Sequence, residues 1–242
     1  MEFTYLSESV KVKRVSEEGK VGHFDIEGLY RGYGVTIGNS LRRVLLSSLP
    51  GAAVTRFKIK GVGHEFSTIK DVLEDVVEIS LNLKKIRFKF YADEAQVLTL
   101  SVKGEKKVTA ADIKGNADVQ IQNLDAHIAT LTSKNAELEM EITVEKGLGY
   151  LPKEDIQKNE KLSIGTIALD AAFSPVVKVN YITENMRVGE RTDFDKIRLE
   201  IETDGTMSPS RALHKAGNIL LDHFKRISDI EIKDSTEETV AN

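Results

Sequence analysis

Alternating apolar and polar residues, typical of half-buried strands, recur along much of the chain. They predict an N-terminal hairpin over residues 9–15 and 20–27, with Glu18-Gly19 as its turn. The same period predicts a strand over residues 53–60 and a mostly β region after Asn82. The apolar positions of that region are Ile86, Phe88 and Phe90; Leu98, Leu100 and Val102; Val119 and Ile121; and Leu138, Met140, Ile142 and Val144.

Toward the C-terminal end, two more stretches, residues 164–182 and 197–203, show strand-like composition. The first of them is interrupted at Ser174-Pro175. Residues 152–161 contain a single large apolar side chain, so we expect an exposed loop there.

Helical periods of three and four residues appear at three places. The first follows a glycine-rich turn, Gly32 to Gly38, and forms an apolar stripe of Leu41, Val44, Leu45 and Leu49. Pro50 disfavours helical geometry at Leu49 and Gly51 lets the chain turn, so this helix is expected to end near Ser48.

The second helix is expected to start at Ser67 or Thr68, which could cap it, and to bury five side chains: Ile69, Val72, Leu73, Val76 and Val77. The third starts at Ser208-Pro209, an N-cap followed by proline at the first helical position. Its apolar residues form a narrow seam suited to packing against another helix. They are Leu213, Ala216, Leu220, Phe224 and Ile227.

Composition narrows the class of protein. With 242 residues, of which 40% are hydrophobic, the chain can form one large or two modest globular domains. It has no cysteine, no bilayer-length apolar run and no signal-peptide core near its N-terminus, so we expect a cytoplasmic protein without membrane contact. Its net charge of −4 argues against a surface devoted to nucleic acid.

Candidate chemistry is sparse. The five histidines show no metal-ligand spacing, and no nucleophile elbow or metalloprotease motif occurs, so we expect no catalytic residue, cofactor or metal. The glycines Gly32, Gly34 and Gly38 could bring backbone N–H groups close to a phosphate at the start of a helix. Their spacing matches neither the dinucleotide fingerprint nor the P-loop. They could equally shape the turn and permit close packing, whereas a ligand role would indicate a small-ligand or nucleotide-binding enzyme.

On the first helix, Arg43 points almost opposite the apolar stripe and Arg42 lies beside the stripe. They could be two solvated surface side chains. A guanidinium held on a short helix with a defined end could also anchor a protein interface, because it binds carboxylates through a planar fork of N–H donors.

The run GYGVTIGNSLRRVLLSSLPG, residues 32–51, closely resembles the motif near the start of the bacterial RNA polymerase alpha subunit family. Further segments resemble the same family in the same order along the chain. These are GVGHEFSTI at 61–69, EDVVEISLNLK at 74–84, VTAADI at 108–113, GLGYLP at 147–152, SPV at 174–176 and RTDFDKI at 191–197.

The resemblance implies an α+β fold in which a dimerisation domain, made of an antiparallel sheet and two helices, is interrupted by an inserted β-rich domain. The dimerisation domain would comprise residues 1–51 and 176–232, and the insertion residues 52–175. Pro50-Gly51 and Ser174-Pro175 are then the crossing points. The polar, acidic stretch 233–242 is expected to be a disordered tail.

The function implied is a non-catalytic scaffold within DNA-directed RNA polymerase, a nucleotidyltransferase. Two copies would form a homodimer and nucleate assembly of the beta and beta-prime subunits. The residues implied at the large-subunit interface are Arg42, Arg43 and Lys84. The dimer interface would comprise Leu41, Val44, Leu45, Leu213, Ala216, Leu220, Phe224 and Ile227. Family members usually continue into a small DNA-binding domain beyond the matched region, so this chain by itself is expected to bind no specific DNA sequence.

Overall fold

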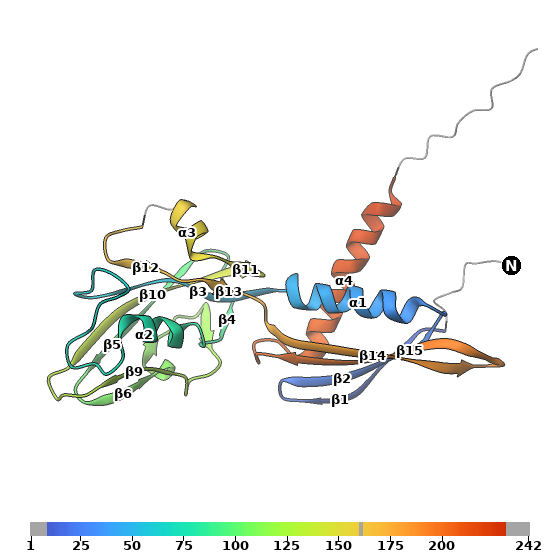
Figure 1. Cartoon of the computed structure of the whole chain (residues 1–242), viewed down its shortest axis with the longest axis horizontal. Coiled ribbons are helices and arrows are strands. Elements are labelled where there is room, and N and C mark those ends of the chain that lie inside the picture. The colour runs from blue at the N-terminus through green and yellow to red at the C-terminus, as the bar shows by residue number, and fades with distance from the viewer. Residues whose placement is uncertain (1–8, 160–161, 231–242) are drawn as a thin grey trace, which may run out of the picture.

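The computed structural model describes residues 9–159 and 162–230. The tail expected at 233–242 lies outside the described residues. Two sheets, each with its own helices, lie end to end along the long axis of the molecule (Figure 1). We call the part built from residues 9–49 and 176–230 the first lobe, and the part built from residues 50–175 the second lobe. The α+β class is confirmed.

The first lobe is a four-stranded antiparallel sheet with the order β1-β2-β15-β14. Its strands are β1 (Lys11–Glu18), β2 (Val21–Leu29), β14 (Val176–Val188) and β15 (Arg191–Thr203). The hairpin expected near the N-terminus is confirmed as β1 and β2. Strand β2 also pairs with β15, so the sheet joins distant parts of the chain.

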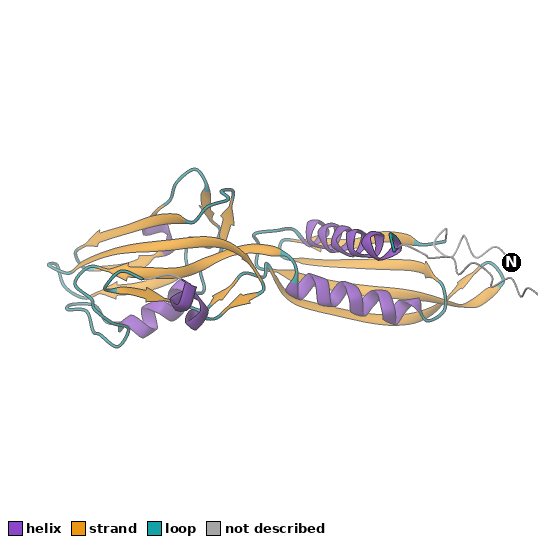
Figure 2. Cartoon of the chain, turned by 90° about the horizontal axis from the view of Figure 1, so that it is seen from above, coloured by secondary structure: helices purple, strands orange, loops and turns teal. Residues whose placement is uncertain are grey.

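Helices α1 (Tyr33–Ser47) and α4 (Pro209–Ser228) pack on one face of this sheet (Figure 2). The expected end of α1 near Ser48 and the expected start of α4 after Ser208 are both confirmed. The side chain of Ser208 accepts a hydrogen bond from the backbone N–H of Arg211, as an N-cap should.

The second lobe is mostly β. Its main sheet has the order β12-β3-β10-β5-β7, and three two-stranded pairs, β11-β13, β4-β8 and β6-β9, lie around it. The main strands are β3 (Pro50–Ile59), β5 (Gln96–Lys103), β7 (Ile113–Lys114), β10 (Glu137–Leu148) and β12 (Thr166–Ala168). The smaller strands are β4 (Phe88–Phe90), β6 (Lys106–Thr109), β8 (Val119–Ile121), β9 (His127–Leu131), β11 (Tyr150–Leu151) and β13 (Ala171–Ala172).

Each lobe has its own hydrophobic core. In the first lobe the core lies between the sheet and the two helices, with Phe24, Leu45 and Ile197 among its buried residues. In the second lobe the core extends from Val54 to Leu169 along the sequence. The chain therefore has two main hydrophobic clusters, one in each lobe, as two independently packed units do. A small third cluster of Ala53, Ala171 and Phe173 belongs to the second lobe.

The second helix is shorter than expected: α2 spans Val76–Leu83, and residues 69–75 are not helical. Asp71 has a positive φ of 60°, and the backbone N–H of Leu73 donates to the carbonyl of Thr130 on β9. This pairing with a strand competes with a helical turn. Asp75 then caps the helix by accepting from the backbone N–H of Glu78.

The expected loop at 152–161 is wrong, because it contains helix α3 (Lys153–Asn159). Its one large apolar residue, Ile156, is buried, and the carbonyl of Pro152 accepts from the backbone N–H groups of Asp155 and Ile156. Glu154 and Asp155 lie in the first turn, where the helix dipole favours acids. This short helix is therefore held by one buried apolar side chain and by hydrogen bonds at its start.

The sequence predicted that the chain turns at Gly51. This prediction is wrong, because Gly51 lies within β3. A Cβ atom at this position would lie 1.8 Å from the carbonyl oxygen of Phe173. Two backbone segments therefore cross here at a distance that no side chain would allow.

Candidate subunit interface

Gly34 and Gly38 of the N-terminal motif lie inside helix α1, which begins at Tyr33, whereas Gly32 is its N-cap, in the turn before it, with a positive φ of 88°. A Cβ atom at Gly34 would lie 2.5 Å from Cγ2 of Thr183, and one at Gly38 would lie 2.7 Å from the ring of Tyr181. Both partners belong to β14. The glycines therefore let the helix backbone lie directly on the sheet.

Asp195 on β15 binds the start of the same helix. One of its carboxylate oxygens accepts hydrogen bonds from the backbone N–H groups of Gly32 and Gly34, both at 2.9 Å. The residue is 7% exposed. A carboxylate at a helix N-terminus is favoured by the dipole and by the free N–H groups there. The donors that could have bound a ligand phosphate are thus already bound to the protein's own Asp195.

Helix α1 offers two arginines to its outer side. Arg42 and Arg43 are exposed, whereas Leu41 and Leu45 are buried in the core of the first lobe. Within the described ranges, no ion pair or side-chain hydrogen bond joins either guanidinium to another residue. Their hydrogen-bonding capacity is therefore available to another molecule.

Lys84 lies elsewhere, at the C-cap of α2 in the second lobe. Its ammonium group lies 2.9 Å from a carboxylate oxygen of Asp170. The other oxygen of Asp170 accepts from the backbone N–H of Lys153 at 3.0 Å. The hydrogen bond from the Lys153 backbone and that from Lys84 hold the pKa of Asp170 below its usual range. Lys84 is thus a half-buried structural cation whose charge is already paired.

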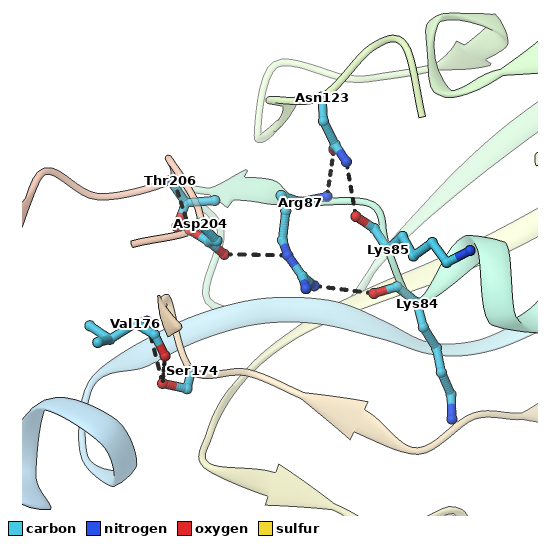
Figure 3. Close-up of polar contacts among 8 residues, drawn as sticks. All are labelled: Lys84, Lys85, Arg87, Asn123, Ser174, Val176, Asp204 and Thr206. Atoms are coloured by element: carbon cyan, nitrogen blue, oxygen red, sulfur yellow. Dashed lines mark hydrogen bonds and ion pairs between the residues drawn. The ribbon is translucent and has the colours of Figure 1, made fainter. Parts of the chain in front are cut away.

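Arg87, which the sequence did not single out, joins the two lobes. Figure 3 shows its side chain reaching the carbonyl of Lys84 at 3.1 Å and the carboxylate of Asp204 at 3.7 Å. The side chain of Asn123 accepts from the backbone N–H of Arg87 and donates to the carbonyl of Lys85. Because Asp204 belongs to the first lobe, its ion pair with Arg87 connects the two lobes. Lys84 and Arg87 lie on the same short segment of the chain.

Asp204 is itself held in place at this junction. One of its carboxylate oxygens accepts from the backbone N–H and the hydroxyl of Thr206, and its own N–H donates to the carbonyl of Pro175. No local period in the sequence indicates such a contact, since its members come from separate parts of the chain.

The residues expected at a dimer interface divide into three groups by exposure. Leu41, Leu45 and Ala216 are buried within the chain's own core, so in one chain they support the fold. Val44, Leu213 and Leu220 are partly buried against that core. Phe224 and Ile227, in the last turns of α4, are 61% and 68% exposed.

Across residues 9–159 and 162–230, no group of three or more histidine, cysteine, aspartate or glutamate side chains could hold a metal ion. Of the helices that these residues form, none combines the length and hydrophobicity needed to cross a membrane.

Comparison with known proteins gives a consistent result. The RNA polymerase Rpb3/RpoA insert domain family matches residues 57–174, which lie wholly within the second lobe. The DNA-directed RNA polymerase subunit alpha of Roseiflexus castenholzii is 48% identical over 232 residues, covering 96% of this chain and 71% of the relative. That of Symbiobacterium thermophilum is 50% identical over 220 residues, covering 90% of this chain and 69% of the relative.

The corresponding subunit of Moorella thermoacetica is 48% identical over 240 residues, covering 96% of this chain and 76% of the relative. The similarity thus extends through both lobes and beyond the insert domain. The chain belongs to the family of bacterial DNA-directed RNA polymerase alpha subunits.

Proposed function

We propose that this chain is the assembly scaffold of a bacterial DNA-directed RNA polymerase in the cytoplasm and contributes no catalytic residue to it. Two copies pair, and the pair presents helix α1 to the large beta and beta-prime subunits. Similarity over nearly the whole chain to proteins named as polymerase subunits supports this role. In the structure, it rests on the exposed Arg42 and Arg43 opposite the buried stripe of α1.

The two lobes correspond in this proposal to two domains. Residues 1–51 and 176–232 make the dimerisation domain, and residues 52–175 are inserted into it. The separate hydrophobic cores of the two lobes support this division. The crossing segments also support it, because the backbone at Gly51 lies in close contact with the backbone of Phe173.

The two proposed contact regions differ in chemistry. Arg42 and Arg43 would bind carboxylates or carbonyl groups of a large subunit through unpaired guanidinium groups. Lys84 already has a carboxylate partner in Asp170, so it would contribute through the position of that ion pair and not as a free cation. We therefore assign the larger part of the binding energy to α1.

The test is the substitution Arg43→Ala. Because Arg43 is exposed and pairs with no described residue, the melting temperature and the oligomeric state should stay unchanged. Removing a charged hot-spot side chain from a desolvated interface typically costs about 2–5 kcal/mol. Co-purification with the beta subunit should therefore fall sharply.

Lys134→Ala, at an exposed turn of the second lobe, is the matched control and should leave capture of the beta subunit unchanged. An Arg43→Ala chain that folds and captures the beta subunit as well as the control does would show that α1 is not the contact surface.

A further inference from the structure

A groove of about 310 Å³ lies where the two lobes meet. Pro50, Gly51 and Ala52, at the start of β3 where the chain crosses from one lobe to the other, are among its lining residues. One wall comes from β4 and β10 of the second lobe, and the other from the first turns of α4 and the segment before it. None of the lining residues is one of the predicted interface residues Arg42, Arg43 and Lys84.

Four cationic side chains line this groove: Lys89 and Lys146 from the second lobe, and Arg211 and Lys215 from α4. Arg211 and Lys215 are four residues apart, so they lie on the same side of the helix. Among the described residues that line the groove there is no aspartate or glutamate.

Little negative charge within the protein balances this cluster. In the part of the chain that the structure describes, its one ion pair is that of Lys146 with Asp93, at 3.7 Å, and the Asp93 side chain is 99% exposed. Such a long and exposed pair contributes little. Lys89, Arg211 and Lys215 make no ion pair with described residues. Four cationic side chains thus lie together in a chain whose net charge is −4.

The groove also has apolar surface. Phe90 and Met207 are half-buried in it, and Tyr91 is largely exposed at its side. Duplex nucleic acid would offer phosphates to the cations of the groove. Carboxylates interspersed with apolar side chains would match both the charge and the apolar patches. We propose that the groove binds an acidic peptide segment, carrying one or two apolar side chains, from a partner protein.

The position of the groove gives this binding a second consequence. Because the two walls belong to different lobes, a bound peptide would join them in addition to the contact between Arg87 and Asp204. The proposal goes beyond assembly of the polymerase, since it needs neither dimerisation nor the arginines of α1.

The test uses the full chain and fluorescence anisotropy. The probe is a fluorescein-labelled short peptide that is rich in glutamate and carries one phenylalanine and one leucine. An analogue with glutamine in place of every glutamate measures the contribution of charge. The double substitution Arg211→Glu with Lys215→Glu should weaken binding of the acidic peptide by about tenfold or more, which corresponds to about 1.4 kcal/mol. The glutamine analogue should bind the unsubstituted chain no more tightly than the acidic peptide binds the double variant.

Lys107→Glu with Lys134→Glu is the matched control. It makes the same change of charge at two exposed lysines of the second lobe, outside the groove, and should alter binding by less than about twofold. A control that weakens binding as much as the groove variant would show diffuse attraction, and the proposal would fail.

A second variant guards against a folding defect in α4. Lys89→Ser with Lys146→Ser changes only the wall formed by the second lobe. It should weaken binding of the acidic peptide as strongly as the double substitution in α4 does, and it should leave the melting temperature unchanged. Binding that survives in this variant overturns the proposal. So does tighter binding of a single-stranded oligothymidylate than of the peptide, when that binding is lost in the same variants, because the groove would then be a nucleic-acid surface.

Discussion

The ring of Tyr181 lies against the backbone of helix α1 because position 38 carries no side chain. The helix thereby comes close enough to β14 for its apolar stripe to reach the core of the first lobe. Glycine within a helix costs up to about 1 kcal/mol relative to alanine. This cost is offset by the packing that the close approach permits.

Gly38→Ala should therefore lower the free energy of unfolding by about 1–3 kcal/mol, the usual cost of overpacking, despite the gain in helix propensity. Urea denaturation measures this change.

The neighbouring exposed residue provides the control. Asn39→Ala introduces the same residue without a steric conflict, so it should change stability by no more than about 0.5 kcal/mol, and in the stabilising direction. If both alanines stabilised the protein alike, Tyr181 would have to move aside at no cost, and the close-packing explanation would be wrong.

At the scale of residues, the sequence predicted the role or direction of a side chain better than it predicted the residues that the side chain contacts. It offered close packing as one role of the glycines, and Gly32 does lie in a turn, but it also placed Gly34 and Gly38 there, because their packing partners lie on a strand far along the chain. Asp195 lies in the segment RTDFDKI, but the sequence did not indicate its role, since a carboxylate that caps a helix from another element leaves no local pattern. Arg42 and Arg43 were identifiable as outward-facing because a helical period fixes direction without any knowledge of the partner.

Carboxylates from the sheet bind the N-terminal turns of both helices in the first lobe. Asp195 binds α1, and Glu17 of β1 binds α4. One oxygen of Glu17 accepts from the backbone N–H of Ser210 at 3.1 Å, and the other accepts from the Ser210 hydroxyl. These hydrogen bonds from the side chain and backbone of Ser210 lower the pKa of Glu17.

This predicts a pH-dependent contribution to stability. Because the pKa of Glu17 is lower in the folded state than in the unfolded chain, its contribution is fully present above about pH 4.5. It is lost as the pH falls through the folded-state pKa. Glu17→Gln should lower the free energy of unfolding by about 1–2 kcal/mol at neutral pH, a typical cost of losing a cap. The difference from the unsubstituted protein should shrink in acid.

Thermal unfolding measured at a series of pH values tests this prediction. Glu18→Gln, at the exposed neighbouring position, is the control and should leave the pH profile unchanged. A difference between Glu17→Gln and the unsubstituted protein that stays constant from neutral pH into acid would contradict the proposed role of the charge.

At the scale of elements, strands and long helices with clear periods were predictable, and short helices were not. The alternation in residues 137–145 predicted a strand, and β10 confirms it. The helical period from Ile69 to Val77 was misleading, because hydrogen bonds to β9 hold residues 71–73 in a non-helical path. Helix α3 was missed because a single buried isoleucine has no period.

The whole molecule presents an exposed apolar surface on the last turns of α4 and just beyond them. It consists of Leu221, Phe224 and Ile227 of the helix and of Ile230 after its end, each more than 60% exposed. Contiguous apolar surface of this kind commonly marks a protein contact. It agrees with the proposed pairing of two copies about a two-fold axis.

Phe224→Glu should therefore produce a folded monomer, because the side chain is exposed in the single chain while a glutamate would be buried in the dimer. Sedimentation equilibrium at micromolar concentration measures the change, and circular dichroism checks the fold. Lys225→Glu adds a glutamate at the next position and should leave the dimer intact. An unsubstituted chain that sediments as a monomer would refute the pairing.

The pairing of β2 with β15 also sets an order of events during translation. A ribosome delivers every strand of the second lobe, from β3 to β13, before β14 and β15 exist. The second lobe can fold while β2 still lacks its central neighbour and α1 lacks the strand on which it packs. An open strand edge and an uncovered apolar helix are the features that invite pairing with other chains. The nascent chain is therefore most vulnerable to aggregation in the interval between completion of the second lobe and emergence of β15.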